Sequence, residues 1–122
     1  MNGVHHLTQT LIARFRQSHN LLFAAHQLAD DDPDLGLMLR SLADISVEIE
    51  TEAHFLSGIA REHNALGYLD PLINAQHSLW QCIWNVSHCN EALSCHEDLL
   101  CLRSDMGALE LLAPALTKRL SS

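Results

Sequence analysis

The side chains with the most distinctive chemistry in this 122-residue chain are its nine histidines and four cysteines, which are common transition-metal ligands. The cysteines stand at positions 82, 89, 95 and 101, in the pattern C-x6-C-x5-C-x5-C. On one continuous helix, neighbouring cysteines would lie about 9 to 10.5 Å apart along the axis, too far for a disulfide or a shared zinc ion. We therefore expect thiols, with Cys82 and Cys89 as small buried hydrophobic residues, whereas a break in the helix would reopen the question for Cys95 and Cys101.

Histidine and carboxylate pairs at helical spacing are few, and none of them matches a known metal site. The pairs are His26 with Asp30, Glu50 with His54, and His88 with Glu91. The Glu-x-x-His pattern of di-iron bundles is absent, and His96-Glu97 lacks the second histidine of H-E-x-x-H. We expect no resident metal or other cofactor. A bundle that binds a metal or a small ligand through His and Glu side chains is the alternative hypothesis.

Motifs of nucleotide binding and hydrolysis are also absent, because the chain contains no G-x-S-x-G, P-loop or G-x-G-x-x-G sequence. The members of a Cys-His nucleophile pair need only meet in space, and nothing in the sequence selects such a pair. We therefore expect that the chain is not an enzyme.

The elements that would position these side chains are predicted to be helices. Hydrophobic residues make up 48% of the chain and aromatic residues only 5%, a balance that disfavours strands. Asp32-Pro33 and Asp70-Pro71 each place an N-cap residue before a proline suited to the first helical turn, and Gly67 suits a helix end. The expected helices span residues 3–29, 33–65 and from 71 onward, in a single domain over residues 1–122.

The third helical segment is predicted either to continue or to divide. The S-x-x-E pattern at residues 94–97 is a capping box and Ser104-Asp105 offers a second break, so we favour a division within residues 87–104. A continuous helix would run to Ala113 and be kinked by Pro114. The expected fold class is all-α: an up-and-down bundle of three long helices, which becomes a four-helix arrangement if the third helix is split into two.

Hydrophobic residues recur every seven positions in the second and third expected helices. The second helix has Leu35, Leu42, Ile49 and Leu56, and the third has Leu72, Leu79, Val86, Leu93 and Leu100. The first helix has a looser stripe of Leu11, Phe15, Leu22, Ala25 and Ala29. Sustained spacing of this kind predicts near-antiparallel helices that pack along their lengths at about 20°.

The third helix carries a second apolar stripe, formed by Ile73, His77, Trp80 and Trp84 at the spacing i, i+4, i+7, i+11. At about 100° per residue, this stripe lies nearly opposite the seven-residue stripe of the same helix. A helix on the outside of a monomeric bundle needs only one apolar stripe, and paired tryptophans are typical of binding surfaces. The second stripe therefore predicts a partner-binding surface, most simply a homodimer contact. A target site and a face covered by another helix are the alternatives.

Fifteen acidic residues against seven basic ones give the chain a formal net charge of −8 at pH 7. Eight of the acids crowd into one stretch: Asp30, Asp31, Asp32, Asp34, Asp44, Glu48, Glu50 and Glu52. Such a surface repels nucleic acid, so we expect no direct nucleic-acid binding. Asp44 and Glu48, one helical turn apart, are candidate contacts for a basic partner, with a merely solvated face as the alternative.

The hydrophobic runs of the chain are short. The longest unbroken run, Leu21–Ala25, cannot cross a bilayer, which takes about 20 residues, so we expect no membrane association. Residues 1–16 show no secretory signal, which predicts a cytoplasmic protein.

A small acidic helical bundle with a spare apolar face is a common form for bacterial proteins that control another protein. The resulting hypothesis is a small regulatory protein-binding module that inhibits or sequesters a protein target, as anti-activators, immunity proteins and secretion chaperones do. The sequence does not identify the protein partner. A metal- or ligand-binding bundle and a subunit with a purely structural role are the other two hypotheses.

Overall fold

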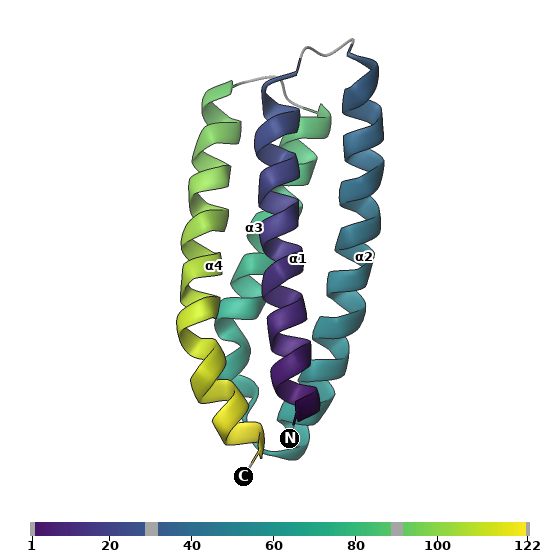
Figure 1. Ribbon diagram of the computed structural model, residues 1–122. Coiled ribbons are helices and arrows are strands. Elements are labelled where there is room, and N and C mark those ends of the chain that lie inside the picture. Colours follow the sequence, from purple (N-terminus) through teal and green to yellow (C-terminus); the bar gives the residue numbers. More distant parts are fainter. Residues whose placement is uncertain (1, 29–31, 89–91, 122) are drawn as a thin grey trace.

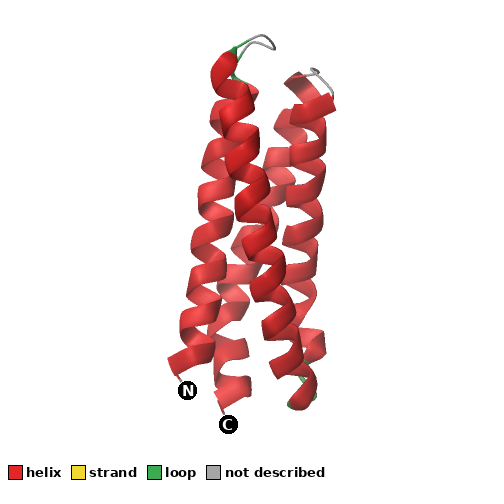
Figure 2. Cartoon of the chain, turned by 90° about the vertical axis from the view of Figure 1, so that its right-hand side faces the viewer, coloured by secondary structure: helices red, strands yellow, loops and turns green. Residues whose placement is uncertain are grey.

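The computed structural model describes residues 2–28, 32–88 and 92–121, which form four helices standing side by side (Figure 1). The helices are α1 (Asn2–His26), α2 (Pro33–Glu62), α3 (Asp70–His88) and α4 (Ala92–Ser121), and a 3-10 turn, η1 (Leu66–Leu69), precedes α3. Figure 2 shows the loops at the two ends of the helices, and the described residues contain no strand. The predicted all-α bundle is confirmed, in the four-helix arrangement expected if the third helix is split into two.

The predicted helix starts correspond to the observed ones within a residue. The Asp32 carboxylate accepts a hydrogen bond from the Asp34 backbone N–H at 2.9 Å, and Pro33 occupies the first turn of α2. Asp70 differs from the predicted N-cap, because its backbone is already helical (φ −53°, ψ −45°) where η1 leads into α3. The expected first helix is also nearly right, with α1 ending at His26 and the predicted end at Ala29 outside the described residues.

The predicted helix end at Gly67 is wrong, because α2 already ends at Glu62. Asn64 adopts the left-handed backbone conformation, with φ 53°, and the backbone N–H of Ala65 donates to the carbonyl of Ala60 at 2.8 Å. Asparagine is, after glycine, the residue that most readily takes this conformation at the end of a helix. Asn64 therefore closes α2 before Gly67 is reached.

The third predicted segment divides, with α3 ending at His88 and α4 beginning at Ala92. The seven-residue stripe predicted to continue through Leu100 is wrong beyond this division, because Leu100 is 52% exposed. The capping box at residues 94–97 lies inside α4 rather than at its start, and Ser104 does not interrupt the helix. The stripe that α4 buries has a different register and consists of Leu99, Leu102, Met106, Leu109, Ala113, Leu116 and Leu120.

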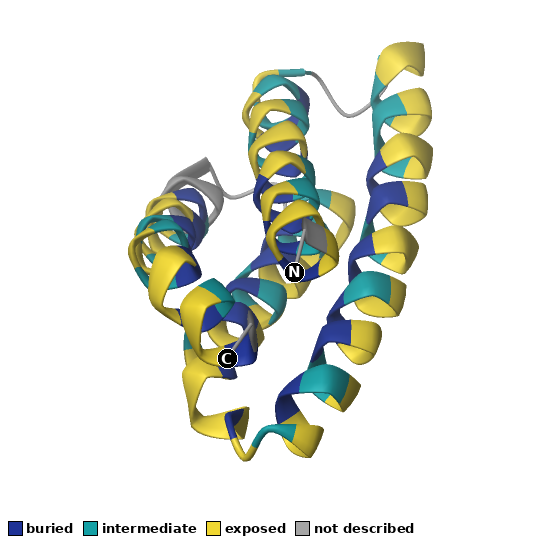
Figure 3. Cartoon of the chain, turned by 60° about the horizontal axis from the view of Figure 1, so that its bottom comes forward, coloured by how far each residue is buried: buried dark blue, intermediate teal, exposed yellow. Residues whose placement is uncertain are grey.

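One buried stripe on each helix faces the middle of the bundle, and Figure 3 shows this stripe running almost the full length of α2. The helix α1 packs against both α2 and α4, and α3 packs mainly against α4. The contact between α2 and α3 is looser. No helix in the described part of the chain is long and apolar enough to span a bilayer.

Candidate protein-binding faces

The second apolar stripe of α3 lies on the surface, and we call its four residues, Ile73, His77, Trp80 and Trp84, the tryptophan face. The exposed fractions are 57% for Ile73, 58% for Trp80 and 50% for Trp84, and His77 is also exposed. The opposite side of α3 supplies the core with the buried residues Leu72, Ala75, Leu79 and Cys82. The helix therefore has an apolar face that the monomer core does not use.

The fourth helix does not cover this face, because α4 lies against a different side of α3. The Ser78 hydroxyl donates to the Asp105 carboxylate, and the Asn85 amide donates to the Asp98 carboxylate. These two bonds tie α4 to the side of α3 that points away from α2. Among the described residues, the alternative in which a further helix buries the tryptophan face is therefore wrong.

The side chains of the tryptophan face are held in place by a few local contacts. The indole Nε1 of Trp80 donates to Oε1 of Glu50 on α2 at 3.2 Å. The ring of Trp84 stacks on the ring of His88, with centroids 3.7 Å apart and an interplanar angle of 17°. His77, Trp80, Gln81 and Trp84 line a shallow hollow of about 420 Å³. The two indole rings are thus oriented before any partner binds.

Two acids border the tryptophan face. Glu50 belongs to α2, and the exposed Asp70 stands three residues before Ile73 on the same side of α3. Among the described carboxylates, that of Glu50 is the one that hydrogen-bonds to this face. Val47 and His54 stand three and four residues from Glu50 and so share its side of α2, and Val47 is 62% exposed. The border that α2 contributes therefore has one acid, one histidine and one apolar side chain.

The predicted contacts Asp44 and Glu48 do not lie beside the tryptophan face, because they occupy the flank of α2 that faces α1. Arg14 of α1 reaches this flank and pairs with Oε2 of Glu48 at 2.5 Å through Nη1, and with Oε1 of Glu52 at 2.7 Å through Nε. The charges of Glu48 and Glu52 are therefore partly balanced from within the chain. Asp44 itself is exposed.

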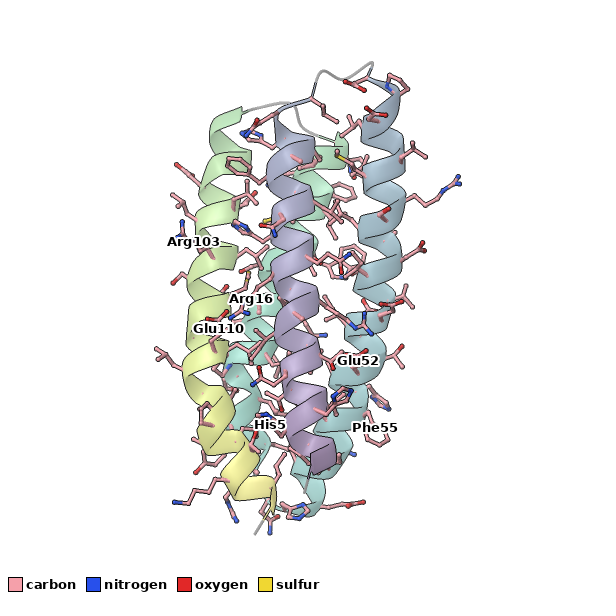
Figure 4. All side chains as sticks on the ribbon, in the orientation of Figure 1. His5, Arg16, Glu52, Phe55, Arg103 and Glu110 are labelled. Atoms are coloured by element: carbon pink, nitrogen blue, oxygen red, sulfur yellow. The ribbon has the colours of Figure 1, made fainter. Side chains whose placement is uncertain are left out.

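A groove between α1 and α2 lies next to these acids, and we call it the acidic groove. It encloses about 460 Å³ and is lined mainly by apolar groups of Val4, Leu7, Phe55 and Ile59, with Arg14 and Glu52 on one side. Phe55 is 64% exposed, and Figure 4 shows it on the same part of α2 as Glu52. An apolar hollow of this kind, bordered by the Arg14–Glu52 ion pair, can accept an apolar side chain of a partner.

A third hollow, of about 440 Å³, lies between α1 and α4. Arg16 pairs there with Glu110 at 2.8 Å, and Figure 4 shows both side chains between the two helices, with Arg103 further along α4. His19 lines the same hollow, and burial lowers the pKa of its imidazole. The nearby guanidinium of Arg103 lowers this pKa further.

The metal-ligating residue types do not converge in the part of the chain that the structure describes, where no three His, Cys, Asp or Glu side chains could hold one ion. Cys82 is a buried thiol, as predicted, and Cys101 is an exposed one. Cys89 and the side chain of Cys95 lie outside the described part of the chain. The structure therefore does not test the predictions for those two cysteines.

Two features of these faces are not evident from the sequence, namely the pairing of Arg14 with α2 and the bond between Trp80 and Glu50. The place of Phe55 could be predicted from the sequence. It stands seven residues after Glu48, a spacing that puts both residues on the same side of the helix. Comparisons with protein-family models, curated proteins and solved structures found no match.

Proposed function

We propose that this protein is a small regulatory protein-binding module that contacts another chain through its tryptophan face. The observation that carries the proposal is the half-exposed pair Trp80 and Trp84 on a side of α3 that the core does not use. The biological role that fits this form best is inhibition or sequestration of a protein target in the cytoplasm of a bacterium, as anti-activators, immunity proteins and secretion chaperones do.

The occupant of the tryptophan face is a second copy of the chain. Two copies that each carry a formal charge of −8 repel one another unless they meet where the acids are sparse. The part of the tryptophan face around the two indole rings is such a place. Glu50 is the carboxylate bound there and its charge is shared with the Trp80 N–H, whereas Asp70 lies at the other end of the face, before Ile73. Two-fold dimers are also the commonest protein assemblies.

The apolar area is large enough to support a moderate dimer. Each half-exposed indole leaves on the order of 100 Å² accessible, so burying four rings across a two-fold contact contributes about 10 kcal/mol. Association costs on the order of 4 to 15 kcal/mol in lost freedom of motion. At the low end of this cost the net free energy is about 6 kcal/mol, so the dimer is expected to dissociate on dilution, with a dissociation constant of tens of micromolar or weaker.

Sedimentation equilibrium of the full chain over a range of concentrations tests the proposal. We expect a monomer–dimer equilibrium in the wild type and at least about tenfold weaker association for Trp80→Ala/Trp84→Ala, because fully desolvated aromatic side chains dominate binding energies. The control is Leu111→Ala on α4, which removes a side chain that is 85% exposed on another face. This control should leave the dimer unchanged.

Two outcomes would overturn the proposal. The first is a wild type that stays monomeric at roughly 1 mM, a concentration well above a dissociation constant of tens of micromolar. The second is a double variant that dimerises as well as the wild type. Urea unfolding of the double variant, measured alongside, should show a single cooperative transition at a lower free energy of unfolding than that of the wild type, because about half of each ring is buried in the monomer.

A further inference from the structure

A stripe of four residues runs along the outer flank of α2 on the α1 side. Leu37, Asp44, Glu48 and Phe55 follow one another at steps of seven, four and seven residues, which keeps them on one side of the helix. Leu37 and Phe55 are each 64% exposed, and Asp44 and Glu48 between them are exposed as well. The stripe therefore has a large apolar side chain at each end and two carboxylates in the middle.

The Phe55 end of the stripe opens into the acidic groove. The hollow of about 460 Å³ lies between α1 and α2, where Val4 and Leu7 of α1 meet Phe55 and Ile59 of α2. Gly3 also lines it and is exposed, so no side chain at this position fills the hollow. The groove can therefore accept an additional apolar side chain.

The charge of the stripe indicates which kind of partner can bind there. Asp44, Glu48 and Glu52 contribute three negative charges. Arg14 and the exposed Arg40, which stands four residues before Asp44 on the same side of α2, contribute two positive charges, so the flank is left at −1. Among the described residues, Asp44 forms no ion pair, and the Glu48 side chain remains 53% exposed despite its bond to Arg14. Positively charged side chains of a partner would find both carboxylates accessible.

From these observations we propose that the stripe and the acidic groove together bind a basic amphipathic helix of a target protein. The target helix places one apolar side chain in the hollow beside Phe55 and another against Leu37, with Lys or Arg side chains over Asp44 and Glu48. The two apolar ends are 18 residues apart on α2, so the bound segment is about 27 Å long, or five helical turns.

This surface lies on the opposite flank of α2 from Glu50 and the tryptophan face. A dimer formed through the tryptophan face therefore leaves the stripe free, and each copy can bind one target helix. The inference extends the proposed function, since it rests on the protein being a protein-binding module. It does not require the tryptophan face to be the dimer contact.

Fluorescence anisotropy with a designed peptide tests the inference on the full chain. The probe is a labelled helix of about 20 residues with leucines at the spacing i, i+3, i+4, i+7 and lysines elsewhere, and the control probe has glutamate in place of lysine. We expect the lysine peptide to bind and the glutamate peptide not to bind. Absence of binding by the lysine peptide at roughly 100 µM would overturn the inference.

Matched variants locate the binding surface. Phe55→Ala should weaken binding of the lysine peptide at least about tenfold, and Asp44→Asn should weaken it severalfold. Phe23→Ala on α1 removes an aromatic ring of similar exposure, 53%, and Glu97→Gln on α4 removes an exposed acid; both should bind as the wild type does. Equal losses in the test and control variants would show unspecific attraction to an acidic protein and would contradict the inference.

The two proposals fail independently of each other. Trp80→Ala/Trp84→Ala should still bind the lysine peptide, and Phe55→Ala should still dimerise in the sedimentation experiment. Loss of peptide binding in the tryptophan variant would place the peptide on the tryptophan face and overturn the inference. Circular dichroism of Phe55→Ala should match that of the wild type, because the side chain is 64% exposed and contributes little to the core.

Discussion

Arg14 is the residue that allows several acids to stand close together on α2. Its guanidinium is planar, with donors that point in fixed directions, so one side chain can donate to two carboxylates at once. It does so with Glu48 and Glu52, at 2.5 and 2.7 Å. Arg14 thereby lets α1 and α2 pack side by side while Asp44 and part of Glu48 stay accessible to a partner.

His19 makes the stability of the protein depend on pH. Burial between α1 and α4 is the main reason why the pKa of His19 lies below the ordinary value of 6.5. The Arg103 guanidinium lowers this pKa further, whereas a hydrogen bond with the backbone of Leu99 raises it. The unfolded chain therefore takes up the proton more readily than the folded one. Stability should fall as the pH decreases through 6.5 toward the folded-state pKa, and His19 should have no effect on the pH dependence above that range.

The variant His19→Gln tests whether protonation of His19 causes the loss of stability at low pH. Its free energy of unfolding in urea should decline less than that of the wild type between about pH 7.5 and pH 5, because glutamine has no proton to gain. Arg103→Gln should reduce the decline in part, and His5→Gln, an exposed residue of α1, should leave it unchanged. A decline in His19→Gln as steep as that in the wild type would show that other groups cause it.

Helices and their buried faces are the part of the fold that can be predicted from this sequence. The start of α2 and the two stripes of α3 depend on residues close together in the chain, such as Asp32 and Pro33 or Ile73 and Trp80, so local rules suffice. The register of α4 is missed because the period of seven runs on through Leu93 to Leu100, across a division that restarts the count. Periodicity alone does not reveal such a restart.

The candidate binding surfaces likewise contain features that the sequence predicts and features that it does not. The tryptophan face is predictable because its four residues belong to one helix. The bonds from Arg14 to Glu48 and from Trp80 to Glu50 join different helices, and their formation depends on how far one helix is shifted along the other. The pattern within a single helix contains no such information, so the sequence does not reveal that Asp44 and Glu48 lie on a different flank of α2 from Glu50 and the tryptophan face.

Pro114 is the least favourable residue for the helix in which it stands. It lies inside α4, where proline removes a backbone hydrogen bond and crowds the preceding turn, and Figure 1 shows α4 curving near its C-terminal end. Pro114→Ala should therefore raise the free energy of unfolding by about 1 to 3 kcal/mol in urea titrations. The residue is exposed, so the substitution leaves no cavity.

A neighbouring exposed position provides the control for this prediction. Ala115→Gly should lower the free energy of unfolding by about 0.5 to 1 kcal/mol if the helix is intact there. A loss of stability in Pro114→Ala would contradict the prediction. It would mean that the bend at Pro114 is needed to bring Leu116 and Leu120, both fully buried, into the core.

At the scale of the whole molecule, the tryptophan face and the stripe from Leu37 to Phe55 lie on opposite flanks of α2. The tryptophan face has Glu50 as its bonded acid, whereas the stripe from Leu37 to Phe55 includes Asp44 and Glu48. One surface suits a partner with the same charge and the other suits a partner with the opposite charge. The overall charge of −8 therefore acts on the two associations in opposite directions.

Salt should separate the two associations in a single protein. The distance over which charges act shrinks from about 30 Å at 0.01 M salt to about 8 Å at 0.15 M, so added salt weakens repulsion between two copies and attraction to a basic helix alike. Raising the salt concentration over this range should strengthen dimerisation in sedimentation equilibrium and weaken binding of the lysine peptide in fluorescence anisotropy. If dimerisation weakened with salt, attraction between opposite charges would hold the copies together, and the apolar rings Trp80 and Trp84 would not be the main contact.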